Sequence, residues 1–443
     1  MSVKILKERY ASGETPRDIV NEIINLSSEY QDRNIWIVPP DMRFIEPYLK
    51  VLDHADRSLP LWGIPFAVKD NIDIVGLPTT AGLQALSSIP EKSAEAVSRL
   101  VCAGAIPVGK TNLDQLATGL TGTRSPYGEC KNAVTPEYIS GGSSSGSAVA
   151  AALGLCSFAL GTDTGGSVRV PAALNGIYGF KPYIGAYPKS GIVPACESID
   201  CAGLLARSLD DISAADAVIR GYDENDAYSR VMPQTTSEPE KYLVPILDDD
   251  RYFYGALYVQ YRNVFSNIIK AISAELPTEY VNIDIFIKVS EFLFDGIFAS
   301  ERWVSLGGIV TQHKDSLLPV TRSVLLSCGN RSTSADDLFA KMHELMKYKH
   351  EIRKMLKGKV IILPTTGGTF TRDEIRGDPF GSNKMLGIFT NHGNILDLSA
   401  LSVPFGSIKT ESCLLPFGIT LYTLPEQEKM LFAAANKIKN TEK

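Results

Sequence analysis

The sequence predicts a globular α/β protein that forms one large domain. Short apolar runs, IPFAVK, IPVGK and FALG, alternate with helical stretches between Leu61 and about Leu209. The run VIILPTT at 360–366 resumes the strand pattern late in the chain. Neither an internal repeat nor a clear linker divides the 443 residues, so we expect one domain, although length alone would suggest two or three.

The expected helices follow from local patterns. Thr-Pro-Arg-Asp is a helix-start signal, and the apolar residues after it predict an amphipathic helix from Thr15 to Tyr30. Helices are also expected from Glu95 to Cys102 and from Ser147 to Leu155, and helical patterns dominate from Phe292 to Tyr348. The acidic, proline-containing stretch from about Ser213 to Glu279 is irregular, which predicts a surface excursion.

The composition argues against several classes of protein. A formal charge of −6 without a long basic run gives no electrostatic footprint for nucleic acid. No run reaches roughly 18 apolar residues, and charged residues appear early, so we expect neither a membrane span nor a signal peptide. Seven cysteines without a C-x-x-C pair are typical of reduced thiols, and we therefore expect a cytoplasmic protein.

The most unusual segment is rich in glycine and serine and spans 140–172, SGGSSSGSAVAAALGLCSFALGTDTGGSVRVPA. A flexible linker is disfavoured, because both Gly/Ser clusters adjoin buried elements. A second interpretation takes Gly142 to Gly146 as a G-x-S-x-G nucleophile elbow with Ser144 as the nucleophile. An elbow needs a histidine base, and none of the five histidines has a local context that marks it as one.

A third interpretation joins both clusters and a lysine in a catalytic triad. The strand FALG ends in TDTGGS, where glycines let backbone N–H groups face one concavity beside Ser167. A serine hydroxyl needs an adjacent base, and a lysine serves as one only where burial favours its neutral amine. Lys69 ends the apolar run of GIPFAVKDNID and is the best candidate. Ser143 would then relay the proton between Ser167 and Lys69.

Two other patterns are rejected on their context. The residues from Gly104 to Thr111 match the phosphate-loop pattern, but here a helix precedes a strand, whereas a phosphate loop follows a strand and opens a helix. His343 and His350 have no third ligand at a metal-site spacing. We therefore expect neither a nucleotide site at Lys110 nor a metal or other cofactor.

These residues resemble the amidase signature family. GIPFAVKDNID, GKTNLDQ, GGSSSGSA and GTDTGGSVRVPA occur in the family's order, with the family's spacing of 24 residues between Ser143 and Ser167. The resemblance implies a mixed β-sheet core covered by helices on both faces. It also implies a Ser-cisSer-Lys triad, in which Ser167 is the acyl-forming nucleophile, Ser143 follows a cis peptide bond and Lys69 is the general base. Ser144 becomes a supporting hydrogen-bond partner.

The resemblance also implies an oxyanion hole and a division of the chain. The oxyanion hole is formed by the amides of Thr164, Gly165, Gly166 and Ser167. The whole of 1–443 is taken as one amidase domain, divided into an N-terminal helical region (1–60), a catalytic core (61–210), a variable excursion (211–290), and pocket helices with closing strands (291–443).

Within the family, the flanking segments TNLDQLATGLTGTRSPYG, VPACESIDCAG and TNHGNILDLSALSVPFG resemble allophanate hydrolases most. This subgroup implies a small anionic urea-derived amide, which loses ammonia through an acyl-enzyme on Ser167. Arg302 matches the arginine that holds the substrate carboxylate, a task suited to guanidinium geometry. The structural alternative is an ordinary helix-surface arginine paired with Glu301 or Asp295. Phe294 stands where the subgroup carries a tyrosine.

Further expectations follow from the same resemblance. The backbone at Gly122 matches a substrate-contacting position, with Arg124 as a weaker candidate. The family implies a homodimer and functional coupling to urea carboxylase, and the second domain of many allophanate hydrolases is not expected here. Two alternatives remain open: an amidase for a related carboxylated urea or biuret-type amide, and an amidotransferase-type subunit that needs a partner.

Overall fold

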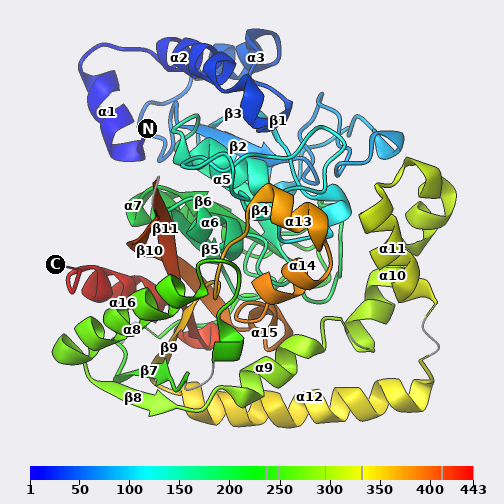
Figure 1. Ribbon diagram of the computed structural model, residues 1–443. Helices are drawn as coiled ribbons and strands as arrows, with labels where there is room; N and C mark the ends of the chain where they lie inside the picture. The colour runs from blue at the N-terminus through cyan, green and yellow to red at the C-terminus, as the bar shows by residue number, and fades with distance from the viewer. Residues whose placement is uncertain (236–237, 248–249, 295, 331–332, 411–412, 443) are drawn as a thin grey trace.

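A mixed β-sheet forms the centre of the molecule (Figure 1). The computed structural model describes residues 1–442 except 236–237, 248–249, 295, 331–332 and 411–412. Within these residues, eleven strands pair in the order β1-β3-β2-β4-β6-β5-β10-β11-β9-β7-β8. Their bounds are β1 Trp36–Val38, β2 Pro65–Lys69, β3 Ile106–Thr111, β4 Phe158–Asp163, β5 Tyr178–Lys181, β6 Cys201–Ala206, β7 Lys241–Pro245, β8 Thr278–Val281, β9 Lys359–Pro364, β10 Ser399–Lys409 and β11 Leu414–Thr423.

Helices cover both faces of this sheet, as expected. Helices α4 and α7 pack together on it, as do α5 and α6, while α8 and α16 contact β10 (Figure 1). The helices are α1 Val3–Ala11, α2 Pro16–Glu29, α3 Met42–Leu52, α4 Glu95–Cys102, α5 Ser145–Ala152, α6 Arg169–Leu174, α7 Leu209–Ile219, α8 Tyr258–Glu275, α9 Asp284–Glu291, α10 Ile297–His313, α11 Pro319–Gly329, α12 Ala335–Leu356, α13 Arg372–Gly377, α14 Gly381–Leu386, α15 Asn391–Ile395 and α16 Lys429–Lys439.

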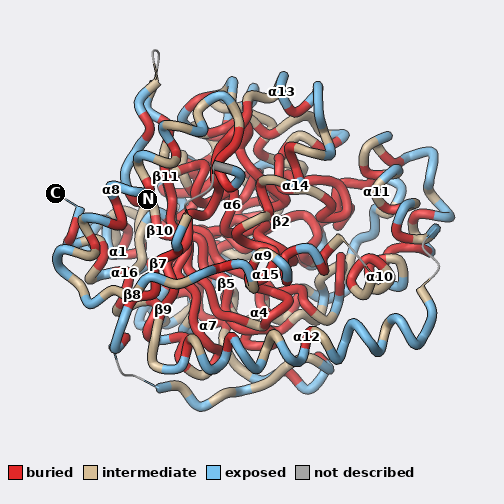
Figure 2. The backbone as a smooth tube through the Cα atoms, turned by 60° about the horizontal axis from the view of Figure 1, so that its bottom comes forward, coloured by how far each residue is buried: buried red, intermediate tan, exposed pale blue. Residues whose placement is uncertain are grey.

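The local signals in the sequence predicted several elements correctly. Helix α2 begins after Thr15, whose side chain accepts from the Asp18 N–H while Asp18 accepts from the Thr15 N–H, which is a complete capping box. Helix α4 has the expected bounds, and α5 begins two residues earlier than expected. Every residue of β2, β3, β4 and β6 is buried, which explains their continuous apolar runs (Figure 2).

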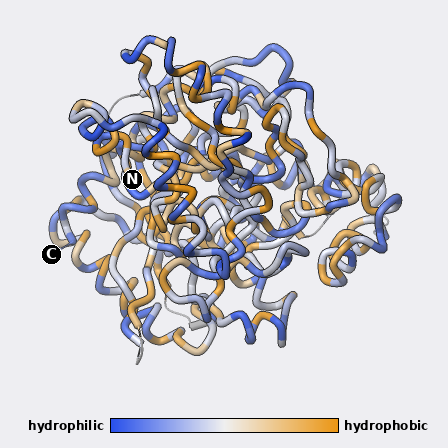
Figure 3. The backbone as a smooth tube through the Cα atoms, turned by 90° about the horizontal axis from the view of Figure 1, so that it is seen from above, coloured by the Kyte–Doolittle hydropathy of each residue, from blue (hydrophilic) through white to orange (hydrophobic). Residues whose placement is uncertain are grey.

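The predicted surface excursion is corrected by the structure. β7 joins the sheet between β9 and β8 and runs parallel to both, with Leu243 and Val244 fully buried. Helix α8 follows and packs on β10 through a buried face that includes Phe265 and Ile272. Only a short apolar run marks β7, and its burial comes from pairing with a strand much later in the chain. Figure 3 shows short hydrophobic and hydrophilic stretches alternating along the chain.

The sheet brings the end of β2, which carries Lys69, close to the end of β4, which precedes the second Gly/Ser cluster. β2 and β4 are parallel neighbours, so that Lys69 at the end of β2 and Asp163 at the end of β4 lie at the same end of the sheet. Chain segments leaving parallel strands at this end commonly form binding sites. The Gly/Ser clusters of the sequence meet here.

Candidate active site

The side chains of Lys69 and Ser143 are hydrogen-bonded to each other. The ammonium Nζ of Lys69 lies 2.8 Å from Ser143 Oγ and 2.7 Å from Thr162 Oγ1, and all three residues are buried. The peptide bond between Gly142 and Ser143 is cis. When the amine is neutral, the same contact can run the other way, with the Ser143 hydroxyl donating to Nζ.

Burial makes the neutral form of Lys69 accessible near neutral pH. The side chain is removed from water, and this desolvation lowers the pKa of Lys69 to about 7, against the opposing pull of Asp114, Asp163 and Asp200. A lysine in this state can accept a proton in the range where an ordinary lysine is fully charged. The electrostatics of the site therefore suit a general base.

The second Gly/Ser cluster is fastened directly to the first. The backbone N–H of Ser144 donates to the carbonyl of Ser167 at 3.1 Å, and the Ser144 hydroxyl donates to the Thr162 carbonyl at 3.1 Å. Ser144 therefore links the loop of the first Gly/Ser cluster to the segment that carries Ser167, which agrees with its expected supporting role. Ser167 is 3% exposed and immediately precedes the segment that leads into α6.

A buried ion pair anchors the loop that carries Ser167. Asp163 and Arg169 are both fully buried, with 2.7 Å between Oδ1 and Nη2, and Arg169 also donates to Asn394 Oδ1 at 2.6 Å. Burial alone would raise the pKa of Asp163, but the charge and hydrogen bonds of Arg169 and the Val168 N–H hold that pKa at about 2. The Asp163 carboxylate thus stays ionised and fixes the turn beneath the nucleophile.

The expected oxyanion hole is only partly available. The Gly166 N–H donates to Asp163 Oδ1 at 2.7 Å, so in this structure the anchor engages this amide, in contrast to the role expected for Gly166. Among the residues that the structure describes, the amides of Thr164, Gly165 and Ser167 have no hydrogen-bond acceptor. These three amides can receive an oxyanion. Gly166 instead provides the left-handed conformation that the turn needs, with φ of 129°.

A small cavity opens directly onto Ser167. Its wall includes Thr164, Gly165 and Ser167 from the oxyanion loop, Leu293 and Phe294 from the segment between α9 and α10, Arg302 from α10 itself, and Asn383 and Asn391 from α14 and α15. The cavity therefore unites the predicted nucleophile with Arg302 and Phe294, which lie more than a hundred residues further along the chain. The two asparagines were not predicted from the sequence.

Arg302 lies in this wall with its charge uncompensated. The residue is 9% exposed, its Nε is buried without a hydrogen-bond partner, and no ion pair to it exists among the described residues. Glu301, one suggested partner, accepts instead from the N–H and the hydroxyl of Ser198. Asp295, the other, lies outside the described residues. A buried guanidinium in a cavity is suited to bind a carboxylate.

The comparisons with known proteins place these features in a family. The amidase family model matches residues 45–432, which is most of the chain. The chain belongs to the amidase family. The protein is thus an amidase, a hydrolase that acts on C–N bonds.

Several relatives of this amidase are longer than the chain itself. It is 37% identical over 417 residues to urea amidolyase of Saccharomyces cerevisiae, covering 91% of this chain and 22% of that protein. The structure of Kluyveromyces lactis allophanate hydrolase matches with a TM-score of 0.91 and 31% identity, over 100% of this chain and 73% of the other. A glutamyl-tRNA(Gln) amidotransferase subunit of Methanosarcina acetivorans is 44% identical over 181 residues, 41% of this chain and 38% of the relative. The amidase spans about a fifth of the curated urea amidolyase.

The expected substrate contact at Gly122 is not supported by the geometry of the amidase. The Gly122 N–H donates to Asp114 Oδ2 at 3.1 Å, and its carbonyl accepts from the Cys130 N–H at 2.9 Å. Both backbone groups are therefore occupied, and the neighbouring Gly119 and Leu120 line the cavity instead. The sequence motif therefore lies next to the cavity lining, although Gly122 itself is not part of that lining.

A second cavity adjoins the first in the amidase. It shares Gly119, Leu293, Phe294, Arg302 and Asn383 with the inner cavity. Arg124 and Lys384 add positive charge to this second cavity. Burial and the nearby charge of Arg302 lower the pKa of Arg124, against the opposing charge of Asp114. Three cationic side chains, Arg124, Arg302 and Lys384, therefore line the cavity next to the one that contains Ser167.

The other sequence patterns have structural roles in the amidase. Lys110 lies within β3, fully buried, with its Nζ 3.1 Å from Asp70 Oδ1, which confirms that the phosphate-loop match is accidental. His392 is the buried histidine, and its Nδ1 lies 3.3 Å from the Ser290 hydroxyl. Burial lowers the pKa of His392 well below its usual value. Among the described residues, no hydrogen bond joins His392 to Ser144, so the structure gives the elbow interpretation no base there.

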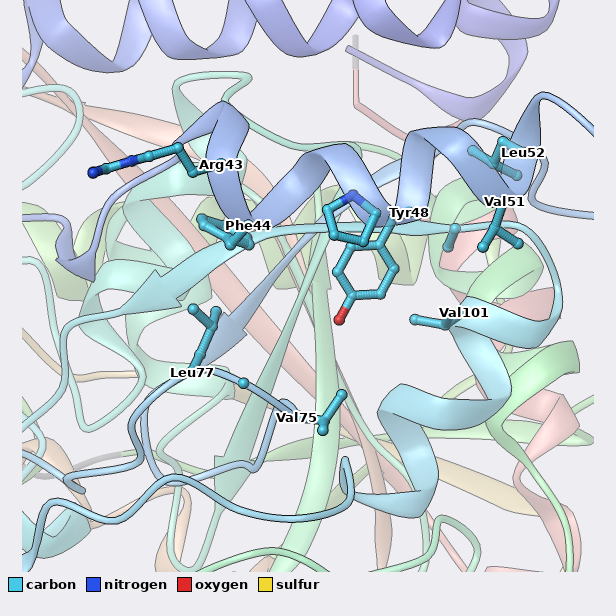
Figure 4. Close-up of a pocket in the computed structure, with 11 residues that line it drawn as sticks. Arg43, Phe44, Tyr48, Val51, Leu52, Val75, Leu77 and Val101 are labelled. Atoms are coloured by element: carbon cyan, nitrogen blue, oxygen red, sulfur yellow. The ribbon is translucent and has the colours of Figure 1, made fainter.

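A large apolar cavity of the amidase lies between α3 and the loop at 75–77 (Figure 4). Phe44, Tyr48 and Leu77 line it, and the Tyr48 hydroxyl points into it. None of the proposed catalytic or substrate-binding residues lines this cavity. Among the described residues, no group of three or more His, Cys, Asp or Glu side chains could hold a metal ion, and no helix is long and apolar enough to cross a membrane.

Proposed function

We propose that this amidase hydrolyses allophanate, the carboxylated form of urea, and releases ammonia. The observation that carries the proposal is Arg302, a nine-tenths buried guanidinium for which the described residues offer no carboxylate partner, in the same cavity as Ser167. Allophanate offers a terminal amide for the serine and a carboxylate for the arginine. The relatives named urea amidolyase and allophanate hydrolase support this substrate.

The proposed reaction begins with a proton transfer. Neutral Lys69 accepts the proton of Ser143, Ser143 accepts that of Ser167, and the Ser167 oxygen attacks the terminal carbonyl carbon. The amides of Thr164, Gly165 and Ser167 stabilise the developing oxyanion. Collapse of the tetrahedral intermediate returns the proton to the leaving nitrogen, so that ammonia departs and an acyl-enzyme remains on Ser167.

Water completes the proposed cycle. The same Lys69 and Ser143 pair removes a proton from water, which attacks the acyl carbon and frees Ser167. One allophanate and one water thus give ammonia and an N-carboxycarbamate, whose two carboxylates bracket one nitrogen. An enzyme that carboxylates urea must supply the substrate, so we also propose functional coupling to a urea carboxylase in the cytoplasm, and a homodimer as the assembly.

Removing the Arg302 charge should discriminate among substrates. We expect Arg302→Ala to lower kcat/KM for allophanate and malonamate by about 10- to 100-fold, because a charged hydrogen bond to the carboxylate is lost. A neutral amide such as propionamide should change by less than about threefold, since it never used the guanidinium. Ammonia release from the purified protein measures all three. An equal effect on charged and neutral amides would show that Arg302 does not bind the carboxylate.

A second candidate function is that of an amidotransferase-type component that acts only with a partner. The 44% identity over 181 residues to a glutamyl-tRNA(Gln) amidotransferase subunit supports this alternative. The same assay separates the two functions. Ammonia release by the purified chain alone supports the hydrolase, whereas failure to release ammonia from any of the three substrates favours the partner-dependent amidotransferase.

A further inference from the structure

The side chain of Asn391 lies directly over the oxyanion loop. Asn391 begins α15 and is 1% exposed, and its backbone N–H donates to the Gly387 carbonyl at 2.9 Å. A Cβ atom on Gly165 would lie 2.8 Å from Asn391 Oδ1, and one on Gly387 would lie 2.6 Å from the same atom. Two glycines therefore leave the space that this carboxamide fills.

The carboxamide oxygen of Asn391 is an unused acceptor. Oδ1 is buried and has no hydrogen-bond partner among the described residues. A buried polar atom without a partner costs free energy, and such atoms are rare in natural proteins, so each one calls for an explanation such as a functional role. Asn391 lines the same cavity as Ser167 and Arg302. Asn383 lies in the same wall, but its Oδ1 accepts from the Leu120 N–H at 2.8 Å. Of the two asparagines in the wall, therefore, Asn391 is the one with an unused acceptor.

The substrate of the proposed function has one donor in the matching place. Its terminal carbonyl oxygen goes to the amides of the Thr164–Ser167 loop, and its carboxylate goes to Arg302. The only donor atom between these two ends is the central nitrogen, which carries one hydrogen. Asn391 lies against the oxyanion loop at Gly165 and lines the same cavity as Arg302, which puts it in the part of the wall between the two ends of the substrate.

We propose that Asn391 Oδ1 accepts a hydrogen bond from the central N–H of the substrate. Asn391 is thereby a specificity residue, which selects a ureido carboxylate over its carbon analogue. This inference rests on the proposed function and adds to it, because Arg302 binds only the carboxylate and does not contact the central nitrogen. Malonamate has a CH₂ group in place of the central N–H and otherwise presents the same amide and carboxylate. Malonamate leaves the acceptor unpaired, which a polar site penalises.

The experiment compares the two substrates in two variants. We expect Asn391→Leu, which keeps the side-chain shape without the acceptor, to lower kcat/KM for allophanate by about 10- to 100-fold. For malonamate, kcat/KM should stay constant or rise, because the variant removes an acceptor that malonamate never satisfied. Turnover of malonamate also shows that the variant is folded. Asn383→Leu is the matched control, and it should lower kcat/KM for both substrates by the same factor, because Asn383 holds the loop at Leu120.

Each outcome decides one of the claims. A loss of kcat/KM on allophanate alone supports the hydrogen bond from the central N–H to Asn391. An equal loss on both substrates, or no loss on either, overturns the inference while leaving the proposed function in place. If the unmodified protein releases ammonia from neither substrate, the proposed function fails, and the inference fails with it.

Discussion

Ser167→Ala should abolish catalysis while leaving the fold unchanged. We expect kcat for ammonia release to fall by about 10⁴- to 10⁶-fold, because the variant cannot form the acyl-enzyme and retains only binding and the oxyanion loop. The thermal midpoint should change little, since removing one hydroxyl leaves the Asp163–Arg169 anchor in place. Steady-state ammonia assays and a calorimetric melt measure the two quantities.

Ser144→Ala is the matched control for this loss. Ser144 lies in the first Gly/Ser cluster, and its hydroxyl bonds to backbone groups of Thr162. We expect this variant to keep activity within about tenfold of the original, with a lower thermal midpoint. The reverse pattern, an active Ser167→Ala and an inactive Ser144→Ala, would restore the nucleophile elbow.

Lys69→Ala should be nearly as damaging and should also change the pH dependence. The loss in kcat/KM is expected to be about 10²- to 10⁴-fold, the usual contribution of a general base. In the unmodified enzyme, kcat/KM should rise with pH as one group loses its proton at about pH 7, because the pKa of Lys69 is lowered to about 7. Below that pH the amine is protonated and cannot accept from Ser143.

The rise of kcat/KM between acidic and neutral pH tests whether the group that loses its proton at about pH 7 is the amine of Lys69. Profiles of kcat/KM from about pH 5 to about pH 9 should lose the limb near pH 7 in Lys69→Ala. A limb that persists unchanged in the variant would belong to another residue. An unaffected rate in Lys69→Ala would remove the lysine from the triad altogether.

Much of the fold follows from local sequence. The continuous apolar runs of β2, β3 and β4 and the capping box of α2 are complete within a few residues each, so pattern alone finds them. β7 is different, because five residues flanked by polar, acidic segments become a buried strand only through pairing with β9. Long-range pairing of this kind is invisible in a local window.

The candidate site shows the same division between local and distant information. The candidates Lys69, Ser143 and Ser167 can be named from the sequence, because two Gly/Ser clusters and one apolar run are unusual and the family resemblance connects them. The commitment of the Gly166 amide to Asp163 depends on the exact turn, which no pattern specifies. Asn391 joins the site from α15, more than two hundred residues after Ser167, and although it lies in the segment TNHGNILDLSALSVPFG, nothing in that segment marks its side chain as part of the site.

The most direct test of the triad is covalent labelling by a fluorophosphonate, a reagent that reacts with activated serine hydroxyls. Peptide mass spectrometry of the labelled protein should find the adduct on Ser167, at a rate that rises with pH through about 7. The Lys69→Ala variant should label at least about 100-fold more slowly. An adduct on Ser144, or labelling of the Lys69→Ala variant at the original rate, would contradict the assignment of Ser167 and Lys69 as nucleophile and base.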